Sequence, residues 1–339
     1  MSRTPPNARA RLLNAALIAL AFALLGLTVW LKRREIGAVI AGKPDLDRMA
    51  LGFGIYMVAL VLTFVRWSIL VRALGLPFRL RDALRLGFIG NVFNLVIPGA
   101  VGGDVVKAAF LCREQARKTR AIASMVIDRI LGLLGLFVLA GLSGLFAWPA
   151  AQGGARALIV VVWAAVGMGF LGLAVLFTPA LYRPLEWLVS GRAKLEAMVV
   201  ELVAMASAYR GRLGTIAGVL GMAVGIHSLY VLAFYEVSLA LFRGAAPSLA
   251  DHLLVVPPTL FTTAIPLPFG ALGVTEQASE QLFKLVRHPD GAVAMLGYRV
   301  LMYAGGLVSA CVYLANLRQV RTLEVEVEGG AVAASGSGR

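Results

Sequence analysis

The sequence predicts an all-α polytopic membrane protein, with about six full transmembrane helices and two re-entrant helical hairpins in an inverted repeat. Three observations predict this fold class. The chain of 339 residues is 59% hydrophobic and only 15% charged, and its mean hydropathy is +0.82. Its apolar residues gather in runs of membrane-spanning length, which is about 20 residues. Two apolar stretches are interrupted by proline and glycine.

Six apolar runs are long enough to cross the hydrocarbon core of a bilayer. The first follows a short basic segment, 1–11. It is long and has no small-residue cleavage site, so we interpret it as a retained helix and not as a signal peptide. We expect a single transmembrane domain over 12–318 and a disordered tail over 319–339. The six predicted spans are 12–31, 49–70, 121–147, 155–177, 214–242 and 293–317.

Two further apolar stretches, near 82–112 and 249–287, are broken. Proline removes a backbone donor and clashes with the preceding turn, and glycine favours a loop. We therefore predict that each stretch forms a re-entrant hairpin, whose two half-helices meet at a tip inside the membrane. The residues at the predicted breaks are Pro98, Gly102 and Gly103 in the first hairpin, and Pro266, Pro268, Gly270 and Gly273 in the second.

The chain contains a weak internal repeat, with halves over about 49–147 and 217–317 and a charged connecting segment over 178–213. The order of span, broken segment and arginine-bearing span is the same in both halves. Inverted repeats with discontinuous helices are typical of transporters that bind near the membrane midplane. One constant offset aligns three pairs of residues: Pro98 with Pro268, Gly103 with Gly273, and Arg129 with Arg299.

The basic residues set the predicted orientation. The segment between the second and third spans holds a dense cluster of Lys and Arg, in which we include Arg66, so we place it on the cytoplasmic side. Both termini then lie in the cytoplasm, and the two halves have opposite orientations. We expect a multi-pass protein of the bacterial cytoplasmic (inner) membrane.

Composition and motifs also exclude several functions. The net charge of +14 does not indicate nucleic acid, because the basic residues cluster between apolar runs. The few cysteines and histidines share no ligand spacing, so we expect no metal and no cofactor. The sequence has no Walker A motif and no serine with an obvious histidine partner. We therefore expect no enzyme activity.

Ionisable residues inside the bilayer cost about 2.5–3.5 kcal/mol each on insertion scales, and each one suggests a function. Asp128 and Arg129 are adjacent on one predicted helix, so their side chains diverge and cannot form a facing pair. We expect Arg129 and Arg299 to flank a central cavity, where the helix N-termini after the breaks favour an anion. The candidate substrate-binding residues are Asp104, Asp128, Arg129, Glu276 and Arg299, with Gly102, Gly103, Gly270 and Gly273.

The bland alternative is that these charges only neutralise one another. Lys107 suits a side chain that reaches the membrane interface, and His227 suits a structural role. A stripe of small residues fits helix packing within the chain or against a second copy, so a homo-oligomer is left open. The possible pairings are Arg129 with Asp104 or Glu276, and Arg299 with Glu236 or Glu276; the stripe comprises Gly214, Gly218, Gly221 and Gly225.

A resemblance to a known family is carried by 91–103 (NVFNLVIPGAVGG), Asp104, Lys107, the Asp128-Arg129 pair and 266–276. These residues resemble the transmembrane region of the lysylphosphatidylglycerol synthase and flippase-like family, over roughly 12–318. The resemblance implies a polytopic inner-membrane fold with two re-entrant elements, associated with moving charged or glycosylated lipids between leaflets.

The chain departs from that family's pattern at three points. Asp128 stands where the family often has Glu. Phe269 and Ala271 stand where glycines are usual, which would narrow or stiffen the second tip. The soluble aminoacyl-transferase domain of the full-length synthases is missing, so we expect no lysyl transfer from this chain.

The leading hypothesis is flippase-like translocation of an anionic phospholipid, or of a polyprenyl- or glycolipid-linked substrate, across the inner membrane. Its partner would be the membrane lipid itself. The alternative is a non-transporting scaffold or accessory subunit, whose partner would be a lipid-modifying enzyme or a glycosyltransferase.

Overall fold

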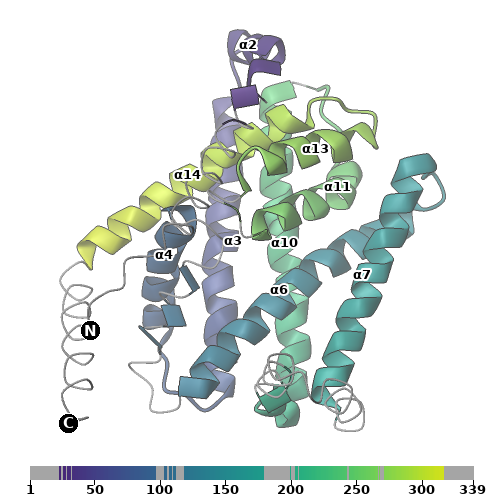
Figure 1. Cartoon of the computed structure of the whole chain (residues 1–339). Coiled ribbons are helices and arrows are strands. Elements are labelled where there is room, and N and C mark those ends of the chain that lie inside the picture. The colour runs from purple at the N-terminus through teal and green to yellow at the C-terminus, as the bar shows by residue number, and fades with distance from the viewer. Residues whose placement is uncertain are drawn as a thin grey trace, which may run out of the picture.

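The computed structural model is helical throughout the residues that it describes, and no strand occurs among them (Figure 1). This confirms the predicted fold class. The predicted N-terminal segment and the C-terminal tail lie outside the described residues, as does most of the first predicted span. The described residues are 23, 26–27, 29–31, 33–96, 103–104, 107–108, 110–111, 118–178, 199, 203–204, 206–242, 244–265, 267 and 271–316.

Five of the described helices are long and apolar enough to cross a membrane, and they match the last five predicted spans. The protein is therefore a multi-pass membrane protein. The prediction succeeded here because runs of about 20 apolar residues leave no stable alternative in a bilayer. These helices are α3 (Leu46–Ala73), α6 (Lys118–Ala147), α7 (Gly153–Phe177), α10 (Leu213–Phe242) and α14 (Gly291–Ala315).

As far as they are described, the helices of the broken segments are shorter than the five spanning helices. At 1.5 Å per residue, α4 (Leu80–Val96) is about 25 Å long and α11 (Leu249–Phe261) about 20 Å, against a hydrocarbon core of about 30 Å. The predicted breaks at Pro98, Gly102, Pro266, Pro268 and Gly270 lie outside the described residues. The remaining elements are α2 (Arg33–Ala41), η1 (Arg210–Arg212), η2 (Thr262–Ala264) and α13 (Val274–Lys284).

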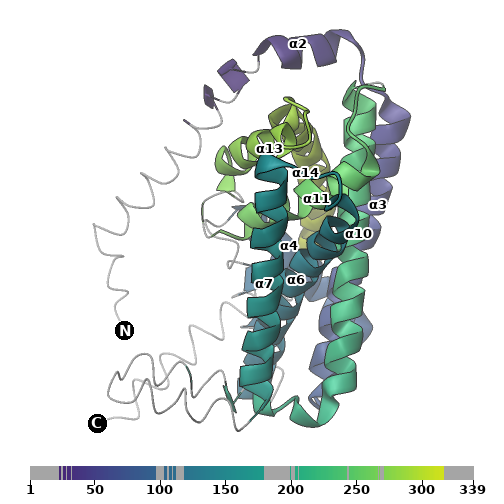
Figure 2. The same ribbon diagram turned by 90° about the vertical axis from the view of Figure 1, so that its right-hand side faces the viewer.

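The long helices α3 and α10 lie side by side and run in opposite directions (Figures 1 and 2). At one end the backbone N–H of Asp45 donates to the Ala240 carbonyl over 3.1 Å. At the other end the Tyr209 hydroxyl donates to the Leu70 carbonyl over 3.0 Å. This antiparallel pair forms the axis on which both halves of the chain are built.

The last long helix of each half packs on the short helix of the other half. Helix α6 contacts α11, and α14 contacts α4. This exchange is compatible with two related halves of opposite orientation, and it leaves a space between them. Among the described residues, helix α7 packs mainly on α6, and only 11% of its apolar window is buried.

Glycines serve close packing at only some of the expected places. A Cβ atom at Gly103 would collide with the Gly90 carbonyl and with Asn94 Oδ1, so the first broken segment needs a glycine against α4. The stripe on α10 is different, because a Cβ at any of its four glycines meets nothing within 4 Å in the described structure. Packing inside the described chain therefore does not explain that stripe, and contact with a second copy stays a prediction.

Candidate functional site

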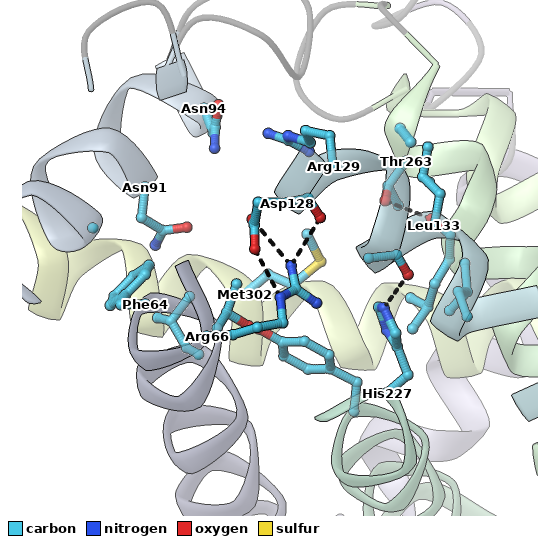
Figure 3. A pocket seen from close by; sticks show the side chains of 18 of the residues that line it. Phe64, Arg66, Asn91, Asn94, Asp128, Arg129, Leu133, His227, Thr263 and Met302 are labelled. Carbon is cyan, nitrogen blue, oxygen red and sulfur yellow. Dashed lines mark hydrogen bonds and ion pairs between the residues drawn. The ribbon is translucent and has the colours of Figure 1, made fainter. Parts of the chain in front are cut away.

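A cavity of about 310 Å³ lies between the two halves of the protein (Figure 3). Its lining comes from α3, α4, α6, α10, α11 and α14, from the η2 turn, and from Lys107 in the first broken segment. Ligand pockets typically measure about 300–1,000 Å³. The cavity therefore has room for a small polar group and not for a whole lipid with its tails.

Arg66 on α3 and Asp128 on α6 form a buried ion pair in the cavity wall. Arg66 Nε lies 2.9 Å from Asp128 Oδ1, and Nη2 lies 3.1 Å from Oδ2. Gly132 gives the guanidinium room, because a Cβ there would lie 3.0 Å from Arg66 Nη2. Our assignment of Arg66 to a cytoplasmic segment is wrong, because α3 continues to Ala73 and only 6% of the Arg66 side chain is exposed.

Arg129 follows Asp128 but faces a different partner, as the adjacency of the two residues predicts. It forms an ion pair with Asp104, whose other oxygen lies 2.7 Å from Lys107 Nζ. The Arg129 side chain remains 44% exposed, and in Figure 3 it points toward Asn94. The Asp104 carboxylate thus holds Arg129 at Nε, while part of the Arg129 side chain remains accessible from the cavity.

Arg299 and Glu276 do not line this cavity. They form an ion pair between α14 and α13 in which 3% and 0% of the side chains are exposed. Glu276 Oε2 also accepts the Gly273 N–H over 2.7 Å and so caps α13. The expectation that both arginines flank one cavity is met by Arg129 and is wrong for Arg299, because Glu276 holds Arg299 inside the second half.

Two residues at the second break have positive φ angles. Gly273, just before α13, has φ of 83°, and Ala271 has φ of 52°. This is the left-handed region, which costs a residue with a Cβ about 1–2 kcal/mol. Ala271 thus occupies a backbone position that suits the glycine usual in the resembled family.

Several cavity residues were missed or discounted from the sequence. Lys107 lines the cavity, and its Nζ lies over the Trp67 ring, 5.4 Å from the ring centroid. It is therefore not a simple interface residue. His227 is held by the Gly132 carbonyl, 2.9 Å from its Nε2, yet it also faces the cavity. Asn91 and Asn94 lie on one face of the apolar helix α4, three residues apart. Two asparagines on one face of an apolar helix are the sequence feature that could have indicated a polar cavity beside α4.

The site has an excess of positive charge. Among the described residues that line it or pair with its lining, the cations are Arg66, Lys107 and Arg129, and the carboxylates are Asp104 and Asp128. One positive charge is left over. Cavity walls of low dielectric strengthen its field, so the cavity favours an anionic group. Arginine is suited to a phosphate, because its planar fork grips two oxygens at once.

A model of the family described as the lysylphosphatidylglycerol synthase TM region matches residues 12–310. The chain belongs to this family. No curated protein matches it, and no solved structure does. Every cavity residue of this lysylphosphatidylglycerol synthase TM-region protein lies within the matched range.

Proposed function

We propose that the protein moves an anionic phospholipid, or a polyprenyl- or glycolipid-linked substrate, between the leaflets of the bacterial inner membrane. The observation that carries this proposal is the cation-rich cavity between the two halves of a multi-pass helical protein. The family match supports a lipid-related role for such a membrane region.

The proposed path separates the headgroup from its tails. A charged headgroup that crosses hydrocarbon unaided loses its hydration without compensation. The cavity would supply Arg129 and Lys107 as partners for the headgroup phosphate, while the tails stay in the bilayer. Its volume fits this division of the lipid. Arg66 would act behind them as a buried positive charge, already paired with Asp128.

Arg299 and Glu276 have a different role in this proposal. Their buried ion pair holds α13 to α14, and neither residue would touch the headgroup in the state that the structure describes. The proposal assigns no catalytic step to any residue. It places both termini on the cytoplasmic side, in keeping with the clusters of Lys and Arg.

The proposal predicts that the purified protein accelerates the exchange of fluorescently labelled phosphatidylglycerol between leaflets of proteoliposomes. Dithionite, which bleaches only the label in the outer leaflet, measures that exchange. Labelled phosphatidylcholine, with no net charge, should exchange more slowly through the same protein. Exchange no faster than in protein-free vesicles, for both lipids, would contradict translocation and favour the scaffold alternative.

A further inference from the structure

A second cavity, of about 600 Å³, lies between the start of α4 and the end of α14. Figure 1 shows these two helices together at one edge of the molecule, on the side opposite α7. Helix α4 begins a few residues after the end of α3, and α14 is long and apolar enough to span a membrane. The cavity therefore lies between a membrane-spanning helix and the short helix of the first half.

The lining of this cavity is amphiphilic. Its polar part holds Arg79, Arg81 and Arg85 with a single carboxylate, Asp82. Arg85 Nη2 lies 3.8 Å from Asp82 Oδ1, a loose contact between partly exposed groups. Two positive charges are therefore in excess among the described lining residues. The apolar part of the lining is Leu84, Phe88 and Val312.

We propose that this α4–α14 cavity is a binding site for an anionic membrane phospholipid. The arginines would hold the phosphate of the headgroup, and the apolar wall would receive the first carbons of the acyl chains. Basic cavities between membrane helices on the cytoplasmic side bind acidic headgroups in this way. The apolar wall favours a lipid over free phosphate, which would gain nothing from Leu84, Phe88 or Val312.

This site is separate from the central cavity. The two cavities share no lining residue, and different residues of α4 contribute to each: Phe88 to the α4–α14 cavity, Asn91 and Asn94 to the central one. The inference does not depend on the proposed translocation, because a lipid bound in this cavity would also serve a scaffold. A lipid bound there would contact both α4 and α14.

Native mass spectrometry of the full chain, titrated with phosphatidylglycerol or phosphatidylcholine, tests the site. The comparison is made in an Arg129→Gln background, so that the central cavity does not contribute. Near an anionic membrane surface each basic residue adds enough affinity that Arg79→Gln/Arg81→Gln should weaken phosphatidylglycerol binding about 30-fold. The matched control is Arg72→Gln/Arg212→Gln, which removes two exposed arginines near the α3 and α10 ends and should leave binding unchanged.

Unchanged phosphatidylglycerol affinity in Arg79→Gln/Arg81→Gln would overturn the proposal, as would an equal loss in the control. Displacement of phosphatidylglycerol by millimolar inorganic phosphate would also overturn it, because it would show a site for a free anion. Phosphatidylcholine, whose choline offsets the phosphate charge, should bind the parent protein more weakly than phosphatidylglycerol and should lose less affinity in Arg79→Gln/Arg81→Gln. Wild-type leaflet exchange is measured separately, so failure of either proposal can be told from failure of the other.

Discussion

Replacement of Arg299 by Met is expected to lower the free energy of unfolding by about 3–5 kcal/mol, because it leaves the Glu276 carboxylate buried without its cation. None of the Glu276 side chain is exposed, so water cannot take the place of the guanidinium. The low dielectric of a buried site raises this cost further. The measurement is equilibrium unfolding in mixed detergent–SDS micelles, followed by circular dichroism.

The double variant Arg299→Met/Glu276→Gln separates this cause from simple loss of contacts. Glutamine keeps a carbonyl oxygen for the Gly273 N–H, which Glu276 Oε2 accepts over 2.7 Å, and it carries no charge. We expect it to recover at least half of the lost stability. Arg212→Met, at an exposed position, should change stability by less than about 0.5 kcal/mol. A double variant no more stable than Arg299→Met would contradict the buried-charge explanation.

The second large effect is on transport. Arg129→Gln should reduce leaflet exchange of labelled phosphatidylglycerol by about 10- to 100-fold, because a charge-assisted hydrogen bond to phosphate contributes about 1.5–3 kcal/mol. Stability should change little. The Arg129 side chain is 44% exposed, and Lys107 remains 2.7 Å from Asp104 as its counter-ion.

Two controls bracket this result. Arg156→Gln removes an arginine that lies over the Trp148 ring, away from the cavity, and should exchange lipid at the wild-type rate. Arg299→Met/Glu276→Gln alters the buried pair of the other half and should also retain exchange where it folds. If Arg129→Gln exchanged lipid at the wild-type rate, Arg129 would not be the main residue that binds the headgroup, and the proposed path would be contradicted.

The helices were predictable because each spanning helix is a local property of the sequence. A run of about 20 apolar residues spans a bilayer whatever its neighbours do. The divergence of Asp128 and Arg129 was predictable for the same reason, since adjacent residues on a helix point in different directions. For the arginines, the sequence limited the possible carboxylate partners to two each, but it could not say which of the two forms the ion pair.

The partners depend on packing between helices, which the pattern along one helix does not contain. Arg66 was assigned to a basic cluster because of the arginines that follow it, and only the position of α6 shows that it meets Asp128. Arg299 was placed at the cavity by analogy with Arg129. Glu276, which also caps α13, draws Arg299 away from it. The internal repeat predicted that Arg129 and Arg299 hold equivalent positions, but it could not predict that their surroundings differ.

The central claim, that a lipid headgroup enters the cavity between the two halves, is tested most directly by cross-linking. Phosphatidylglycerol with a photoreactive headgroup would be incorporated with the protein into nanodiscs, and the labelled peptides identified by mass spectrometry. We predict adducts on cavity-lining segments of α6 and α14, such as those around Leu133 and Met302, and their loss in Arg129→Gln. Adducts confined to lipid-facing surfaces such as α7, unchanged by that substitution, would contradict the claim.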